Sequence, residues 1–166
     1  MNKISAYCLL IVLLFSSCVE SDALKYNDSL VQYYNETDKY VGDFYKHANR
    51  LLRENNLSQL PQYAEDAIDD LDECIERVRQ LQGPEGSVEY QNAVVTYIEA
   101  QVMYVNTMSD EYSHVTDSTS EVEFNRIERL IERTIRERIQ KNEAIIEAQR
   151  SFAQKHNFKV QNGENE

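Results

Sequence analysis

Hydrophobic residues recur at every third or fourth position along most of the chain, which is the spacing of amphipathic α-helices. The clearest run is an unbroken seam of about six turns, formed by Leu30, Tyr34, Thr37, Val41, Phe44, Ala48 and Leu51. Polar breaks divide the pattern into four segments, and we predict helices over residues 22–55, 58–82, 87–115 and 119–157. Four long helices joined by short breaks favour an all-α, antiparallel up-down-up-down four-helix bundle spanning residues 22–158.

Local signals support these boundaries. Pro61 falls in the first turn of the second helix, where a missing N–H is harmless, and Gly83-Pro84 is the strongest helix breaker in the chain. Ser87 is a suitable N-cap for the third helix, and the polar run 117–120 followed by glutamates signals the start of the fourth. Gly42 lies inside the first helix, where it would allow a neighbouring helix to approach closely.

The amino-acid composition and net charge exclude some fold classes and some kinds of binding partner. The 166 residues include only two prolines and four glycines, which argues against a turn-rich β-sandwich and against low-complexity disorder. The formal net charge is −12. Because nucleic-acid binding needs clustered Lys and Arg, we expect no nucleic-acid partner.

The first eighteen residues differ from the rest of the chain. Lys3 is their only charged side chain, and an apolar run over 6–15 leads into Phe15-Ser16-Ser17-Cys18. A run of about ten residues is too short for a membrane-spanning helix, which needs roughly twenty, but it fits the tripartite form of a secretory signal. The last four residues resemble the lipobox of bacterial lipoproteins, in which the cysteine thiol is acylated and becomes the mature N-terminus.

This resemblance implies a signal peptide over residues 1–17, a lipidated Cys18 that attaches the protein to a membrane, and a short tether over 18–21. The alternative is an ordinary signal peptide cut after Ser16 or Ser17, which leaves Cys18 as a free thiol. The lipobox usually has Leu at the position of Phe15, and a Phe at this position resembles the lipoprotein signal peptides of the Bacteroidota. By resemblance to enteric sorting rules, Val19 favours the outer membrane, with the bundle facing the periplasm or the cell surface.

A second resemblance covers the mature chain. The segment Ala148-Gln-Arg-Ser-Phe-Ala-Gln-Lys-His-Asn-Phe158, together with Lys25-Tyr-Asn-Asp28, resembles a family of uncharacterised four-helix surface lipoproteins of Bacteroidota and spirochaetes. The resemblance implies a lipid-anchored bundle on or under the outer membrane of the bacterial cell envelope. It brings no known activity and no catalytic residues.

One cysteine remains once the signal and the anchor are accounted for. Cys8 leaves with the signal peptide, so Cys74 is the only other thiol and an intramolecular disulfide is excluded. Cys74 falls on the apolar spacing of the second helix, which predicts a buried, inert thiol. A reactive or metal-ligating role is the alternative, but no basic neighbour or second soft ligand is evident.

Acidic residues are concentrated in the first three helices. Residues 84–120 contain six acidic side chains and no Lys or Arg, whereas residues 121–166 contain nine of each. The second helix has an acidic face that includes Asp66, Asp69, Asp70 and Glu73. This face is either a solvated exterior or a docking surface for a basic envelope protein.

The fourth helix and the tyrosines also leave alternatives open. Arg126, Arg129, Arg133 and Arg136 recur at helical spacing, and they either pair with nearby acids or bind an anion or glycan. Arg138 and Asn142 lie nearer the apolar seam and are candidates for buried polar residues that set helix register. Two trios of tyrosines spaced by seven suit boundary packing, with stacking on sugars or on a partner helix as the alternative.

The sequence offers little support for catalysis or a cofactor. A di-iron bundle needs two Glu-x-x-His motifs, and Glu111-x-x-His114 is the only one here. No nucleophile–base pair, phosphate loop or zinc spacing is evident, so we predict no enzyme activity and no cofactor. The sequence therefore favours a non-enzymatic outer-membrane lipoprotein with a binding or structural role. The alternatives are an inhibitor or immunity-type lipoprotein that masks a basic cell-wall hydrolase, and a metal-binding bundle.

Overall fold

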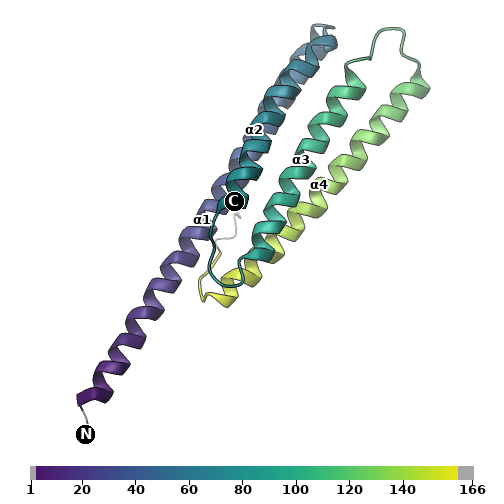
Figure 1. Ribbon diagram of the computed structural model, residues 1–166. Coiled ribbons are helices and arrows are strands. Elements are labelled where there is room, and N and C mark those ends of the chain that lie inside the picture. Colours follow the sequence, from purple (N-terminus) through teal and green to yellow (C-terminus); the bar gives the residue numbers. More distant parts are fainter. Residues whose placement is uncertain (1–2, 161–166) are drawn as a thin grey trace, which may run out of the picture.

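The computed structural model describes the backbone of residues 3–160 and the side chains of residues 22–160. This part of the chain contains α1 (Lys3–Arg53), the 3-10 turn η1 (Leu57–Gln59), α2 (Leu60–Gln80), α3 (Val88–Tyr112) and α4 (Glu121–Lys155), with no strand among the described residues. Successive helices run in opposite directions (Figure 1). The predicted all-α, antiparallel four-helix bundle is confirmed.

The start of the first helix differs from the prediction. We expected it at residue 22, after a short tether over 18–21, but α1 begins at Lys3 and continues unbroken to Arg53. The physical reason is that residues 3–41 contain neither glycine nor proline, so nothing interrupts the backbone hydrogen bonds. The first turns of α1 extend past the end of the bundle (Figure 1).

The other boundaries agree with the prediction to within a few residues. Pro61 lies in the first turn of α2. Ser120 caps α4, where its hydroxyl accepts a hydrogen bond of 3.2 Å from the backbone N–H of Glu123. Ser87 occupies the N-cap position of α3, but its side chain makes no capping hydrogen bond. Most of the predicted tail lies in residues 161–166, outside the described residues.

The predicted seams form the core. Leu30, Phe44 and Leu51 of α1 are buried with residues from α2 and α3. At one end of the bundle, Phe152 of α4 packs against Tyr26 of α1, with ring centroids 5.7 Å apart. The beginning of the packed part of α1 and the end of α4 therefore lie together, as an even number of alternating helices requires.

Two glycines show opposite environments. A Cβ on Gly83 would overlap the Ser87 side chain and lie 2.7 Å from the Tyr26 ring, so this position requires glycine. A Cβ on Gly42 would have no atom within 4 Å. The expectation that Gly42 allows close helix approach is therefore wrong, because no neighbouring helix reaches it.

The α4 helix is only partly covered by its neighbours. Ile131 and Ile145 are buried, but Ile135 and Ile139 between them are 38% and 54% exposed. On α1, Tyr45 and Leu52 are 50% and 55% exposed. These exposed apolar side chains mark a stretch along which α1 and α4 do not close over the core.

Candidate functional site

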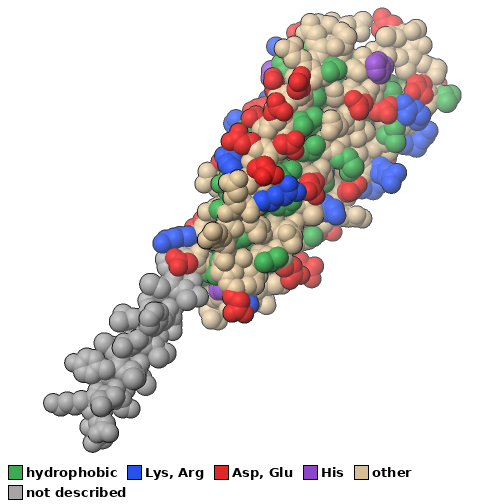
Figure 2. Space-filling view, viewed as in Figure 1, with side chains coloured by type: hydrophobic (Ala, Val, Ile, Leu, Met, Phe, Trp, Pro, Cys, Tyr) green, Lys and Arg blue, Asp and Glu red, His purple; other side chains and the backbone are tan. Residues whose placement is uncertain are grey.

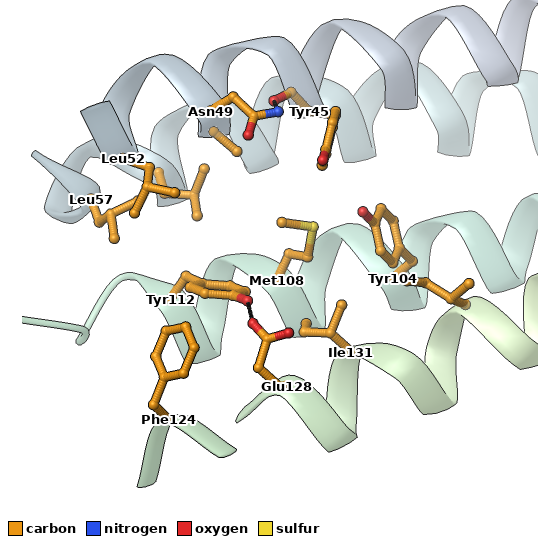
Figure 3. A pocket seen from close by; sticks show the side chains of 13 residues that line it. Tyr45, Asn49, Leu52, Leu57, Tyr104, Met108, Tyr112, Phe124, Glu128 and Ile131 are labelled. Carbon is orange, nitrogen blue, oxygen red and sulfur yellow. Dashed lines mark hydrogen bonds between the residues drawn. The ribbon is translucent and has the colours of Figure 1, made fainter. Parts of the chain in front are cut away.

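A pocket opens where α1 and α4 fail to close, near the turn between α3 and α4. Its volume is about 340 Å³. Its walls are mainly aromatic and aliphatic side chains from α1, α3 and α4, with further residues from η1 and the start of α2 (Figure 3). Among the labelled side chains, Tyr45 and Phe124 are partly exposed, whereas Met108 and Ile131 are buried.

One polar contact lies inside this pocket. The Tyr112 hydroxyl donates a short hydrogen bond to the Glu128 carboxylate, joining α3 to α4 (Figure 3). Burial raises the pKa of Tyr112 above its ordinary value, and the neighbouring Glu128 raises it further. Burial also raises the pKa of Tyr104. Both tyrosines are therefore neutral hydrogen-bonding groups at neutral pH.

A second hollow of about 200 Å³ continues along α4 and shares Ile135 with the first. In it, the Tyr34 hydroxyl donates a hydrogen bond of 2.9 Å to Asn142 Oδ1. The Arg138 guanidinium lies 4.5 Å from the centroid of the Tyr104 ring. Arg138 and Asn142 are half-buried and contact α3 and α1 respectively, where the sequence suggested polar residues near the seam.

The sequence analysis missed a polar cluster in the middle of the bundle. Asp38 of α1 accepts a 2.5 Å hydrogen bond from the Tyr97 hydroxyl and a 2.9 Å bond from Gln101 Nε2, both on α3. Gln101 is fully buried, and its Oε1 atom has no hydrogen-bond partner among the side chains and backbone that the structure describes. No sequence signal identifies this cluster, because Asp38 lies 59 positions from Tyr97.

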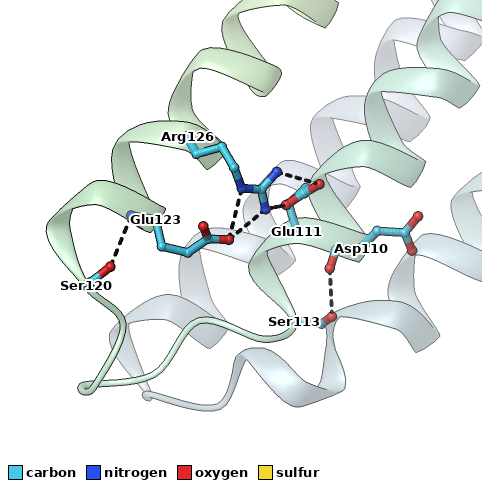
Figure 4. A network of polar contacts seen from close by, with 6 residues as sticks. All are labelled: Asp110, Glu111, Ser113, Ser120, Glu123 and Arg126. Atoms are coloured by element: carbon cyan, nitrogen blue, oxygen red, sulfur yellow. Dashed lines mark hydrogen bonds and ion pairs between the residues drawn. The ribbon is translucent and has the colours of Figure 1, made fainter.

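A network of ion pairs joins α3 and α4 at the rim of the first pocket, near the α3–α4 turn (Figure 4). Arg126 of α4 contacts Glu123, 2.7 Å away, and also pairs with Glu111 of α3. Pairing with nearby acids, one of the two alternatives for the arginines of the fourth helix, is thus found at Arg126. Within residues 22–160 no ion pair joins α4 to α2, because α4 packs chiefly on α3.

Glu111 was also the carboxylate of the only Glu-x-x-His motif. In the structure it pairs with Arg126, and His114 lies two residues beyond Tyr112, where α3 ends. Among the described residues, no group of three or more His, Cys, Asp or Glu side chains is placed to hold a metal ion.

The acidic face of the second helix is solvent-exposed. Figure 2 shows acidic side chains along α2 and basic ones gathered along α4. Asp66, Asp69, Asp70 and Glu73 are all exposed on α2. Of these four, only Glu73 forms an ion pair within the described residues, at 3.8 Å from Arg77.

The two remaining cysteines fall in different parts of the chain. Cys74 is fully buried, and desolvation raises the pKa of its thiol. Arg77 donates a hydrogen bond of 3.2 Å to its sulfur, so the chain does supply the basic neighbour that the sequence analysis did not find. Cys18 lies within the helical backbone of α1, but its side chain is outside the described residues.

The tyrosine trio of α3 packs between helices. Tyr90, Tyr97 and Tyr104 of α3 are all buried. Tyr90 donates a 3.4 Å hydrogen bond to Asn27, and the Tyr34 and Tyr97 rings stack with centroids 5.1 Å apart. These contacts agree with the packing interpretation of the tyrosine spacing.

The described residues include no helix with the length and hydropathy needed to cross a membrane. Comparison of the chain with family models, with curated proteins and with solved structures found no match. The similarity to four-helix surface lipoproteins therefore stays a prediction from the sequence.

Proposed function

We propose that the chain is a lipid-anchored, non-enzymatic helical-bundle lipoprotein of the bacterial outer membrane, acting by binding a partner or by supporting the envelope. The observation that carries the proposal is the segment Phe15-Ser16-Ser17-Cys18, which follows a short apolar run and directly precedes the bundle. Two or three acyl chains on Cys18 would give stable anchoring, because each buried methylene contributes about 0.8 kcal/mol.

The anchor is tested by metabolic labelling with an alkyne fatty acid in a bacterium that has an outer membrane. We expect the unmodified chain to incorporate label, to lose residues 1–17 and to fractionate with membranes. Cys18→Ala should abolish both labelling and cleavage. Cys8→Ala is the matched control, because it removes a cysteine from the same apolar segment and leaves Phe15-Ser16-Ser17-Cys18 intact.

Fatty-acid labelling and the site of cleavage decide this experiment better than membrane partition alone. An uncleaved Cys18→Ala chain keeps its apolar segment and could still adhere to membranes through it. Label on Cys18→Ala, or an unlabelled unmodified chain cut after Ser16 or Ser17, would refute the lipid anchor.

The second candidate is an inhibitor or immunity-type lipoprotein whose acidic face masks a basic cell-wall hydrolase. The exposed carboxylates on α2 favour it, because Asp66, Asp69 and Asp70 have no ion-pair partner among residues 22–160. Their charge is therefore available to attract a basic protein at long range.

Calorimetry against a panel of basic cell-wall hydrolases, at low and high salt, tests this candidate. The variant neutralises the face with Asp66→Asn, Asp69→Asn, Asp70→Asn and Glu73→Gln. The matched control neutralises four exposed acids of α4 with Glu121→Gln, Glu132→Gln, Glu143→Gln and Glu147→Gln. We expect salt-sensitive binding that only the first variant loses. Equal loss in both, or the absence of binding to any hydrolase, would contradict the masking role.

A further inference from the structure

The pocket near the α3–α4 turn has an uneven distribution of charge. Thirteen side chains line it, and Glu128 is the only charged one. The rest of the wall is apolar or aromatic apart from Asn49. The nearby cation Arg126 is directed to Glu111 and Glu123 at the rim and does not line the pocket (Figure 4). A ligand in this pocket therefore meets one carboxylate and no positive charge from its walls.

The aromatic walls reinforce this preference for a cation. The faces of Tyr and Phe rings are electronegative and attract cations within about 6 Å of the ring centroid. Tyr112 and Phe124 lie at the end of the pocket that contains Glu128, whereas Tyr45 lies across the pocket, nearer to Tyr104 (Figure 3). Tyr104, at the opposite end of the pocket from Phe124 (Figure 3), already has the Arg138 guanidinium over its ring.

The order of residues along α4 sets the orientation of a ligand. Glu128, Ile131 and Ile135 lie on one face of the helix, at spacings of three and four. Arg138 lies ten residues beyond Glu128, which corresponds to about 15 Å of helix rise. A cationic group is therefore attracted to the Glu128 end and repelled from the Arg138 end, with apolar side chains between them.

The size of the pocket limits the ligand. Its volume of about 340 Å³ is at the lower end of the range for small-molecule sites, roughly 300–1,000 Å³. We propose that the pocket binds a small organic cation, an ammonium group attached to a compact apolar body, with the cation against Glu128 and the apolar part against Met108 and Ile135. The site is independent of the lipid anchor and of the acidic face on α2.

Three compounds of similar shape and different charge test the proposal: phenyltrimethylammonium, its neutral isostere tert-butylbenzene, and the anion benzenesulfonate. Binding is measured by ligand-observed NMR on the full chain in lipid nanodiscs, with empty nanodiscs as the blank. We expect saturable binding of the cation with a Kd about tenfold below that of the neutral isostere, and no binding of the anion. Equal binding of the cation and the neutral isostere would overturn the proposal, as would failure of the cation to bind.

Variants locate the binding. Glu128→Gln should raise the Kd of the cation about tenfold and leave that of tert-butylbenzene unchanged. Glu143→Gln is the matched control, because Glu143 is an exposed acid of α4 outside the pocket. Should Glu128→Gln lose its helical circular dichroism, Phe124→Leu replaces it, since Phe124 lies beside Glu128 and is 41% exposed, and the loss of its ring should weaken binding of the cation more than binding of the neutral isostere (Figure 3). An unchanged Kd for the cation in a folded Glu128→Gln or Phe124→Leu chain would refute the assignment.

Discussion

Replacing Phe152 by alanine tests the packing at the end of the bundle where α1 and α4 meet. Phe152 is 2% exposed, and its ring lies 5.7 Å from that of Tyr26, 5.6 Å from that of Tyr90 and 5.8 Å from that of Phe158. Truncating a buried Phe to Ala costs about 3–5 kcal/mol, from lost transfer free energy and the cavity left behind. Because Phe152 joins α1, α3 and α4, we expect a loss of about 4 kcal/mol.

Urea unfolding followed by far-ultraviolet circular dichroism measures this loss. With a urea m-value of about 2 kcal/mol per molar, the midpoint should fall by about 2 M. Phe124→Ala is the matched control, because Phe124 is on the same helix but is 41% exposed in the pocket. It should cost about 1 kcal/mol. Equal shifts for the two variants would refute the conclusion that Phe152 is a central packing residue.

Three further predictions follow from burial and backbone geometry. Burial raises the pKa of Tyr90, Tyr97 and Tyr112 in the folded chain. In the unfolded chain a tyrosine has a pKa of about 10. The stability that these neutral side chains contribute is therefore complete below about pH 10 and is lost as the pH rises further. Tyrosinate absorbance from these three side chains should therefore appear only as the helical circular dichroism disappears, and complete ionisation of the tyrosines in a still-folded chain would contradict this. Gly42→Ala should stabilise the chain by about 1 kcal/mol in urea unfolding, since no atom lies within 4 Å of the added Cβ, whereas Gly83→Ala should destabilise it. In a chain with Cys8→Ala and Cys18→Ala, Cys74 should react with a maleimide only after denaturation, and rapid labelling of the folded chain would show that the thiol is accessible.

Helix number and order were predictable because their signals are local. The seam in α1, the position of Pro61 and the cap at Ser120 each depend on residues within a few turns of one another. The start of α1 was not predictable from the signal-peptide pattern, because the cleavage site that this pattern predicts contains no residue that interrupts a helix. A pattern that predicts cleavage near Cys18 says nothing about whether the backbone there is helical.

The pocket shows a different limit of sequence reasoning. Ile131, Ile135 and Ile139 continue the same apolar spacing, yet only Ile131 is buried. Periodicity identifies which face of a helix is apolar but not whether a neighbouring helix is close enough to cover it. The sequence did predict the acidic face of α2, and its four residues lie together on an exposed side of that helix. The Asp38–Tyr97 and Glu128–Tyr112 contacts depend on helix pairing and needed the structure.

The unbroken course of α1 also sets the greatest distance at which the pocket would stand from a bilayer. Phe152 marks one end of the bundle and Glu128 lies 24 residues earlier in α4, which corresponds to about 36 Å of helix rise. A chain tethered at Cys18 would enter the bundle through α1 without a hinge. With the bundle axis perpendicular to the bilayer, the pocket would then lie several Debye lengths above the headgroups, since that length is about 8 Å at physiological salt. Its ligands would be taken from the surrounding solution, and the surface charge of the membrane would have no influence on which of them bind.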